Sequence, residues 1–389
     1  MAEWKYVKIG DVCTVERGGS PRPIDKFITE DENGVNWIKI GDTTDSMYIT
    51  KTAQKIIPEG MKKSRYVQPG DLLLSNSMSF GRPYIMKIDG CIHDGWLVLR
   101  DENNLFDKRF LYYYLSAPST YQKLKNMAVG GVVNNLNSKM VREVSVPLPS
   151  MNEQLKIISV LSSVENLIIS RNKQLNKLDE LVKSRFVEMF GRVCDNKYSY
   201  EVKSLQDVCE KIKDGTHQTP KYTDDTVSGY KFLSSKDVTT GRINWEHIKY
   251  IPEELHNELY AKIAPRRGDI LLAKNGTTGI AAIVDTDEVF DIYVSLALLR
   301  PVDLNSVYLW AAINSYETKQ QFDASLKGVG VPNLHLGEIK KTRILVPPLD
   351  LQNQFADFVA QVDKSKLAVQ KSLEQLEILK KSLMQAYFG

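Results

Sequence analysis

The chain has 389 residues, of which 42% are hydrophobic and 25% charged, and its formal net charge is +3. This length predicts two or more domains, and this balance is typical of a soluble globular protein. No run of 18 apolar residues occurs and residues 1–5 lack a signal-like segment, so we expect a cytoplasmic protein without membrane contact. The four cysteines are too few and too scattered for a disulfide framework or a zinc ribbon.

Short strands and one helical region are expected in each half of the chain. The strands are predicted at residues 37–40, 72–74, 95–100, 231–234 and 295–300. Helices are predicted over 109–124 and 306–322, and Pro118 should break or kink the first. Pro69 and Gly70 suit the two central positions of a type II turn. This mixture of short strands, glycine turns and a few helices indicates α+β domains.

Two long stretches, residues 152–190 and 352–388, are expected to form helices, because they lack proline and glycine and are rich in helix-favouring residues. Their apolar residues recur in steps of three and four, the spacing of a left-handed coiled-coil seam. The predicted seam residues are Leu161, Val164, Ile168, Leu175, Leu178, Val182 and Met189, then Phe355, Phe358, Val362, Val369, Leu376, Leu379, Leu383 and Ala386. The polar interruptions are Arg171, Arg185, Ser365 and Ser372. The alternative is two core helices of ordinary globular domains.

An internal repeat covers nearly the whole chain. The matched pairs include residues 4–13 with 200–209, 18–20 with 214–216, 70–74 with 268–272 and 146–154 with 346–354. A period near 200 residues is far too long for a solenoid, so each copy is a domain followed by its helix. The predicted boundaries are 1–150 for the first domain, 151–191 for the first helix, 192–350 for the second domain and 351–389 for the second helix.

Motifs for enzymatic chemistry are missing from the sequence. Residues 346–349 are not the Asn/Asp-Pro-Pro-aromatic motif of a DNA methyltransferase, and residues 276–279 lack the Gly-Lys-Ser/Thr of a phosphate-binding loop. Glu338 and Lys340 have nuclease-like spacing but no suitable acidic partner precedes them, and the five histidines show no metal-ligand spacing. We therefore expect a binding protein that is not itself an enzyme.

Polar loops at matching places in the two copies are the candidate binding sites, because their side chains suit base edges and phosphates. In the first domain the candidate DNA-binding residues are Ser20, Arg22, Lys39, Asn76, Ser77, Ser79, Arg82, Asn134 and Asn135. In the second they are Thr216, His217, Gln218, Lys236, Lys274, Asn275, Thr277, Thr278 and Asn333. The alternative for each is an ordinary solvated turn.

The order of these features, repeated twice, resembles a known family. The features are the duplicated unit, the Gly-Asp-Leu/Ile-Leu-Leu strands, Asn135-Leu136 and Asn333-Leu334, and the run Val146–Gln154 that leads into a long helix. Together they resemble the specificity (S) subunits of type I restriction–modification systems. The second copy keeps the pattern, although Asn353 stands where Glu153 does in the first.

This resemblance implies that each domain is a target-recognition domain that reads one half of a bipartite, asymmetric target in double-stranded DNA. It implies that the helices space the two domains and dock two methyltransferase subunits, which bring S-adenosylmethionine. A restriction or motor subunit would bring ATP and Mg²⁺, so no cofactor or metal is expected on this chain. Two antiparallel helices of roughly 58 Å, related by pseudo-two-fold symmetry, would act as a ruler. The alternative function is a coiled-coil scaffold without DNA readout.

Overall fold

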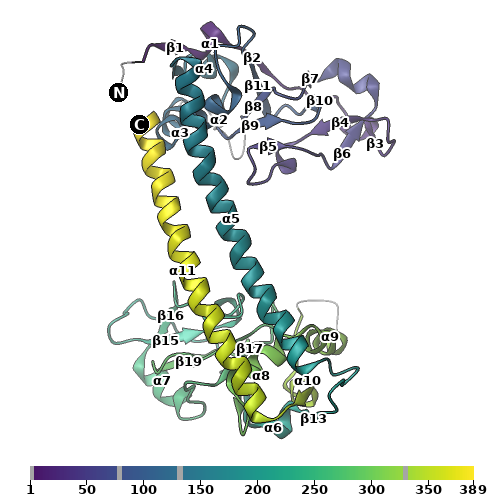
Figure 1. Ribbon diagram of the computed structural model, residues 1–389, viewed down its shortest axis with the longest axis vertical. Coiled ribbons are helices and arrows are strands. Elements are labelled where there is room, and N and C mark those ends of the chain that lie inside the picture. The colour runs from purple at the N-terminus through teal and green to yellow at the C-terminus, as the bar shows by residue number, and fades with distance from the viewer. Residues whose placement is uncertain (1–3, 77–80, 129–134, 327–331) are drawn as a thin grey trace. The chain divides into compact units, whose positions relative to one another are not determined.

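The computed structural model describes residues 4–76, 81–128, 135–326 and 332–389. The chain divides into two compact units: unit 1 is Met1–Asn172 with Lys371–Gly389, and unit 2 is Lys173–Gln370. The division falls inside two 40-residue helices, α5 (Met151–Phe190) and α11 (Leu349–Phe388), so each helix has one part in unit 1 and the other in unit 2 (Figure 1). Both predicted long helices are therefore present, and at 1.5 Å per residue each is roughly 60 Å long.

Unit 1 contains two sheets and a short strand pair. One sheet has the order β2-β11-β8-β9-β5, and the other has the order β3-β6-β4-β10-β7. The first consists of β2 (Thr14–Arg17), β5 (Tyr48–Ile49), β8 (Leu72–Ser75), β9 (Pro83–Met86) and β11 (Trp96–Arg100). The second consists of β3 (Ile28–Thr29), β4 (Val35–Ile38), β6 (Gln54–Ile56), β7 (Arg65–Val67) and β10 (Gly90–Ile92). Strand β1 (Tyr6–Lys8) pairs with β12 (Ser145–Pro147), so the start of the unit lies beside the residues that lead into α5.

The helices of unit 1 cover the hydrophobic core at the first sheet. They are α1 (Ile9–Val12), α2 (Lys108–Ser116), α3 (Pro118–Ala128) and α4 (Ser138–Arg142), with the 3₁₀ turns η1 (Ile24–Lys26), η2 (Ile40–Asp42) and η3 (Pro58–Lys63). Helix α2 ends at Ser116 and α3 begins at Pro118, so the predicted break is confirmed. Proline has no N–H to continue the helical hydrogen bonds of α2, but it is well suited to start α3.

Unit 2 repeats this plan with fewer strands among its described residues. Its sheets have the orders β14-β20-β17-β18 and β16-β15-β19, with β13 and β21 forming a separate pair. The strands are β13 (Glu201–Ser204), β14 (Cys209–Asp214), β15 (Tyr230–Leu233), β16 (Lys249–Ile251), β17 (Ile270–Ala273), β18 (Ala281–Ile283), β19 (Phe290–Ile292), β20 (Leu296–Pro301) and β21 (Arg343–Val346). The helices are α6 (Leu205–Val208), η4 (Ser235–Asp237), α7 (Glu253–Tyr260), α8 (Ser306–Ile313), α9 (Tyr316–Ser325) and α10 (Leu336–Lys341).

Every predicted strand overlaps an observed one, but the single helix predicted over 306–322 is wrong. The structure has two helices there, α8 and α9, separated at Asn314 and Ser315. The Asn314 side chain donates to the Ala281 carbonyl and accepts from the Ala281 N–H, which ties this point to strand β18. Ser315 then caps α9 by accepting from the Thr318 N–H. These polar contacts end one helix and start another.

The turn predicted at Pro69 and Gly70 is confirmed, and unit 2 repeats it. The Asp71 N–H donates to the Gln68 carbonyl at 3.0 Å, and Gly70 has a positive φ of 96°. A type II turn requires such a φ at its third residue, which favours glycine. In unit 2 the equivalent glycine, Gly268, has a φ of 90°.

The hydrogen bonds correct two parts of the repeat alignment. Gln154 donates through Nε2 to the carbonyl of Pro149, and Gln352, not Gln354, makes the same bond to Pro347. The second copy is therefore shifted by two residues here, and Leu351 rather than Asn353 stands where Glu153 does. Likewise, the N–H groups of Gly18 and Gly215 make equivalent bonds to β11 and β20. Gly18 therefore corresponds to Gly215, one residue later than in the match of residues 18–20 with 214–216. The residue letters alone matched neighbouring prolines and glycines instead.

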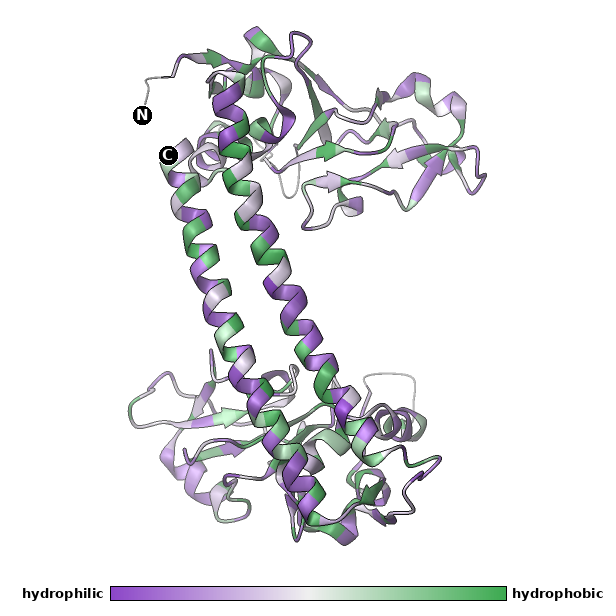
Figure 2. Ribbon diagram, in the orientation of Figure 1, coloured by the Kyte–Doolittle hydropathy of each residue, from purple (hydrophilic) through white to green (hydrophobic). Residues whose placement is uncertain are grey.

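Helices α5 and α11 run antiparallel within each unit. In unit 1 Glu165 pairs with Lys380 at 2.8 Å, and the two polar interruptions Arg171 and Ser372 meet, with Nε donating to Oγ at 3.3 Å. In unit 2 the Phe186 and Phe355 rings lie 5.5 Å apart. Figure 2 shows hydrophobic and hydrophilic residues alternating along both helices. A polar residue that interrupts the apolar seam of α5 therefore contacts one that interrupts the seam of α11, and each gives the other a hydrogen-bond partner.

Two of the predicted seam residues lie outside the seam. Leu379 and Ala386 are exposed, whereas Met384 and Phe388 are buried in the core of unit 1. The seam changes face at this end because the last turns of α11 pack against α2 as well as α5. The apolar spacing could not show that second contact.

Candidate nucleic-acid interface

The polar loops predicted to bind DNA are joined by the same backbone hydrogen bonds in both units. In unit 1 the Asn76 N–H donates to the Gly95 carbonyl, and the Leu136 N–H donates to the Asn76 carbonyl at 3.0 Å. In unit 2 Lys274 takes the place of Asn76, with Ser295 and Leu334 as its partners. Each unit thus brings together the end of β8 or β17, the start of β11 or β20, and a segment that lies 60 residues after Asn76 or Lys274 in the chain. The fold gathers loops that are distant in the sequence.

In unit 1 the gathered side chains surround one carboxylate, Asp94. Its Oδ1 accepts from Ser20 Oγ at 3.0 Å and lies 2.9 Å from His93 Nε2, while Arg22 Nη2 is 3.5 Å from Oδ2. The Asn76 amide donates to the Asp94 carbonyl at 2.9 Å. Three predicted residues, Ser20, Arg22 and Asn76, therefore meet at an acidic residue that was not predicted.

The environment of Asp94 keeps its carboxyl group ionised. Burial raises its pKa, but the hydrogen bond from Ser20 and the positive charges of neighbouring side chains outweigh burial and leave the pKa of Asp94 below its ordinary value. At neutral pH the group is therefore a hydrogen-bond acceptor whose negative charge is balanced by its surroundings.

In unit 2 the corresponding carboxylate is Asp214. Its Oδ2 accepts from Lys274 Nζ at 2.9 Å and lies 3.1 Å from His217 Nε2. Burial raises the pKa of Asp214, but the hydrogen bond and charge of Lys274, and then those of His217, lower it below the ordinary value. Lys274, one of the predicted DNA-binding residues, is only 6% exposed.

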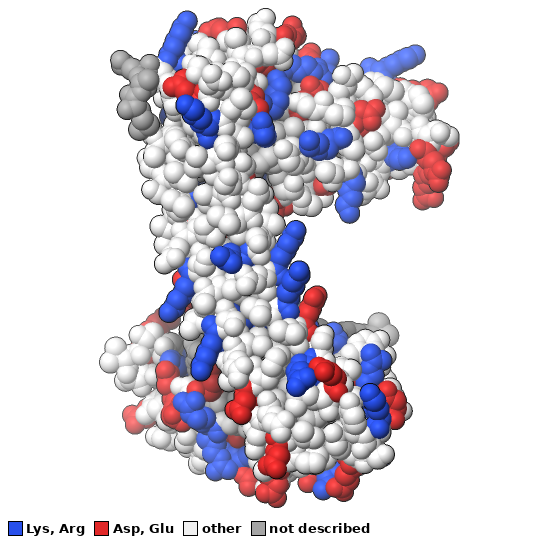
Figure 3. All heavy atoms as spheres, in the orientation of Figure 1, with Lys and Arg blue, Asp and Glu red and all other residues white. Residues whose placement is uncertain are grey.

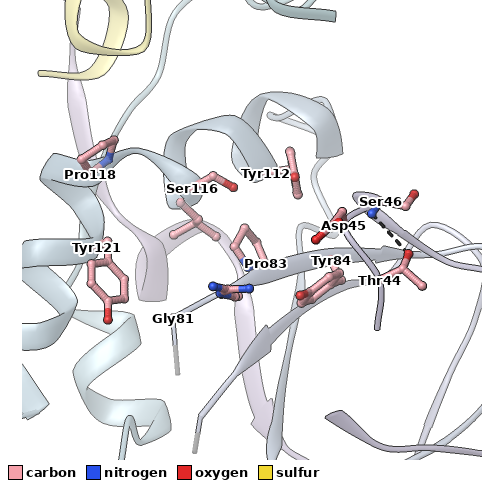
Figure 4. Close-up of a pocket in the computed structure, with 12 residues that line it drawn as sticks. Thr44, Asp45, Ser46, Gly81, Pro83, Tyr84, Tyr112, Ser116, Pro118 and Tyr121 are labelled. Carbon is pink, nitrogen blue, oxygen red and sulfur yellow. Dashed lines mark hydrogen bonds between the residues drawn. The ribbon is translucent and has the colours of Figure 1, made fainter. Parts of the chain in front are cut away.

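The remaining predicted residues of unit 1 lie in two different cavities or outside the described residues. Lys39 donates through Nζ to Gln54 Oε1 at 2.7 Å and lines a cavity of about 710 Å³ together with Ser20 and Arg22. Arg82 lines another cavity of about 600 Å³, whose wall includes Tyr112 from α2 and whose surroundings are drawn in Figure 4. Asn135 is partly buried before Leu136, and Asn76 is almost fully buried. Ser77, Ser79 and Asn134 lie outside the described residues.

The remaining predicted residues of unit 2 form two groups. Thr216, His217 and Gln218 line a cavity of about 370 Å³ beside Asp214. Asn275 and Asn333 form an isolated antiparallel bridge, and the turn that carries Thr277 and Thr278 follows it. The buried Oδ1 atoms of Asn275 and Asn333 have no hydrogen-bond partner among the described residues. Lys236 is exposed on η4 and belongs to neither group.

Sequence reasoning missed the acidic members of the site because it searched for donors to phosphates and bases. It also missed a buried pair in unit 2, in which His256 Nδ1 lies 2.7 Å from Asp291 Oδ2 and the imidazole stacks on Tyr230. Burial raises the pKa of Asp291 to about 6, although the contact with His256 lowers it. The position of Asp94 was a usable signal, because it lies directly before the strand predicted at residues 95–100, whose copy at residues 295–300 was also predicted.

The described residues contain neither a candidate metal centre nor a membrane-spanning helix. No group of three or more His, Cys, Asp and Glu side chains among them could hold a metal ion. None of the helices in the described part of the chain is long and apolar enough to cross a membrane. On the face shown in Figure 3, basic and acidic side chains are intermixed over each unit.

The comparison with known protein families decides the identity of this fold. A model described as the type I restriction modification DNA specificity domain matches residues 1–180 and again residues 198–378. This chain belongs to that family. The predicted family is confirmed, together with the α+β fold in which two such domains are combined with packed long helices. The match assigns to the specificity subunit a role in DNA recognition and not in catalysis.

Full-length relatives agree with this assignment, and solved structures share the fold. The chain is 25% identical to the type I restriction enzyme MjaVIII specificity subunit of Methanocaldococcus jannaschii, over 98% of this chain and 91% of the relative. It is 20% identical to the EcoBI specificity subunit of Escherichia coli, over 99% and 85% of the two chains. The S subunit of M. genitalium has a similar fold, with a TM-score of 0.54, 15% identity and coverage of 100% and 96%. A chain from a structure on complex assembly in a type I system gives a TM-score of 0.61, with 17% identity and coverage of 100% and 98%.

Proposed function

We propose that this specificity subunit reads a bipartite, asymmetric target in double-stranded DNA, with one recognition domain for each half of the target. The observation that carries this proposal is the pair of polar clusters at equivalent places, one around Asp94 and one around Asp214. The backbone framework of the two clusters is the same, but the side chains differ. Equivalent frameworks with different side chains suit the reading of two unlike short sequences.

The DNA-contacting residues are proposed to be those predicted from the loops, with two changes of role. Ser20, Arg22, His217 and Gln218 reach the surface or a cavity at the clusters and would contact bases or phosphates. Asn76 and Lys274 are buried, so they would position the loops instead. The predicted contacts of the other residues, including Ser77, Ser79 and Asn134, stay part of the proposal.

Helices α5 and α11 are proposed to dock two methyltransferase subunits and to fix the spacing between the recognition domains. Both helices expose large apolar side chains on surfaces away from their seam. The exposed ones are Met151, Leu155, Val160, Leu167, Ile169, Leu181 and Val187 on α5 and Leu349, Leu367, Ile378 and Leu379 on α11. Exposed apolar side chains that lie along one element mark protein interaction surfaces when they form a patch.

The partner subunits supply the chemistry in this proposal. The methyltransferase subunits would hold S-adenosylmethionine, and restriction subunits would hold ATP and Mg²⁺. Working with these partners on host DNA would place the chain in the cytoplasm. The boundaries proposed for the functional parts are the predicted ones, with domains at 1–150 and 192–350 and helices at 151–191 and 351–389.

The test is co-expression of the chain with its methyltransferase subunits, followed by methylome sequencing. We expect methylation at one motif with two specified parts and an unspecified gap, and none at that motif when the chain is omitted. Arg22→Ala should change only one half of the motif, and His217→Ala should change only the other. A complex that assembles while the methylated sequences do not depend on the chain would indicate the alternative scaffold function.

A further inference from the structure

The two recognition domains have exchanged the position of their acidic residue. The bonds of Gly18 to the Trp96 carbonyl and of Gly215 to the Leu296 carbonyl fix which residues are equivalent. Arg17 in unit 1 therefore stands where Asp214 stands in unit 2. By the same register, Asp94 in unit 1 stands where unit 2 has a valine, Val294. Each cluster thus contains one carboxylate, but the two carboxylates come from opposite sides of the same framework.

Each carboxylate has one oxygen engaged twice and a second oxygen with unused acceptor capacity. Asp94 Oδ1 contacts Ser20 and His93, while Oδ2 has a contact at 3.5 Å from Arg22, beyond the ordinary length of a charge-assisted hydrogen bond. Asp214 Oδ2 contacts Lys274 and His217, while Oδ1 accepts from none of the described residues. A carboxylate can accept about four hydrogen bonds, so both groups keep unused capacity.

Both carboxylate side chains are partly exposed, and basic side chains balance their negative charge. The Asp94 and Asp214 side chains are 29% and 19% exposed, which leaves them at the surface of their clusters. Each is in contact with two basic side chains, and the lowered pKa values mean that the carboxylates stay ionised near neutral pH. An isolated carboxylate would be repelled by DNA phosphates, but a neutralised one can approach the bases.

We propose that Asp94 and Asp214 are specificity-determining residues, each of which accepts a hydrogen bond from the exocyclic amino group of one base. In the major groove the amino groups of cytosine and adenine are the donors that a carboxylate can read, and thymine and guanine present acceptors at the same place. One such base lies in each half of the target. This inference rests on the proposed function, because it names the residues that make the reading selective.

The experiment compares variants in the reconstituted complex with methyltransferase subunits, S-adenosylmethionine and a library of targets that carry every base at each specified position. Removing Asp214 alone would leave Lys274 buried without a counter-charge, so the variant is Asp214→Ala in a Lys274→Asn background. Asparagine is the residue that unit 1 has at this position, and Lys274→Asn alone is the reference. Asp94→Ala is the variant of unit 1. Asp287→Asn is a matched control, because Asp287 is an exposed acid of unit 2 that pairs only with Arg267 among the described residues.

We expect each alanine variant to lose selectivity at a single base pair by roughly 5- to 150-fold, in a different half of the target for each variant. The other specified positions should keep their preferences, and the control should match the unchanged subunit. Unchanged selectivity at every position, or a uniform loss over a whole half, would overturn the inference, because the carboxylates would then only hold the loops. If the unchanged subunit itself shows no sequence preference, the proposed function fails instead. Circular dichroism melting confirms that the variants are folded.

Discussion

The last aromatic residue of the chain is predicted to be essential for the stability of unit 1. Phe388 is 5% exposed although it is the last residue of a 40-residue helix. Its ring lies 5.6 Å from Phe110 and 5.8 Å from Tyr114, both edge to face, and its carbonyl accepts from Ser119 Oγ at 2.7 Å. Helix ends normally fray, so the sequence position alone would suggest that a substitution here has little effect.

Phe388→Ala should lower the free energy of unfolding of unit 1 by about 4 kcal/mol. Truncating a buried phenylalanine costs about 3–5 kcal/mol, and the ring of Phe388, with its two edge-to-face contacts, is expected to fall near the middle of that range. Phe190→Ala is the matched variant for unit 2, because Phe190 ends α5 and lies 4.9 Å from Tyr308 and 5.6 Å from Phe355.

Hydrogen exchange followed by mass spectrometry would check this prediction, because it reports protection separately for peptides of each unit. Phe388→Ala should increase exchange in α2, β8 and β11 while peptides of unit 2 keep their protection. Phe190→Ala should do the reverse. A loss below about 1 kcal/mol, or equal loss in both units from either substitution, would refute the reasoning that each helix end completes the core of one domain.

Four further outcomes are expected. Inserting four residues in α5 near Gln174 adds about 6 Å of helix and should lengthen the gap of the methylated motif by one or two base pairs without changing its halves, as read by methylome sequencing; an unchanged gap would mean that the helices do not set it. Ile378→Glu should weaken copurification of methyltransferase subunits at least tenfold while the melting temperature of the free chain stays the same, because this side chain is 67% exposed. Asp269→Asn should destabilise unit 2 by about 3–5 kcal/mol in urea unfolding, because it removes the carboxylate that pairs at 2.7 Å with Arg300, whose side chain is only 11% exposed; a loss below about 0.5 kcal/mol, the size of a surface effect, would contradict this. Burial raises the pKa of Asp291 in the folded state to about 6, so the folded protein holds this proton more tightly than the unfolded chain does. The free energy of unfolding should therefore fall by on the order of 3 kcal/mol as the pH rises from ~4 to ~6, and Asp291→Asn should abolish this pH dependence.

The periodic parts of the fold were predictable because the forces that produce them act locally. The apolar spacing of residues 152–190 places side chains along one helix face whatever the helix packs against, and α5 follows that prediction closely. The break at Pro118 and the turn at Gly70 follow from the backbone geometry of single residue types. By contrast, Leu379 fits the same spacing and is exposed, because burial depends on which element lies opposite.

The sequence by itself determined that the chain is a duplicated domain with a long helix after each copy, because a repeated order of motifs and a helical period are both written in the residue letters. Only the tertiary structure decided which residues of the two copies are equivalent, since Gln154 and Gln352 are matched by a shared hydrogen bond and not by their neighbours. It also decided that Lys274 points into the protein while its partner Asp214 lies at the surface of the cluster. The direction of a polar side chain is set by the loops that the fold brings against it, and those loops lie tens of residues away in the chain.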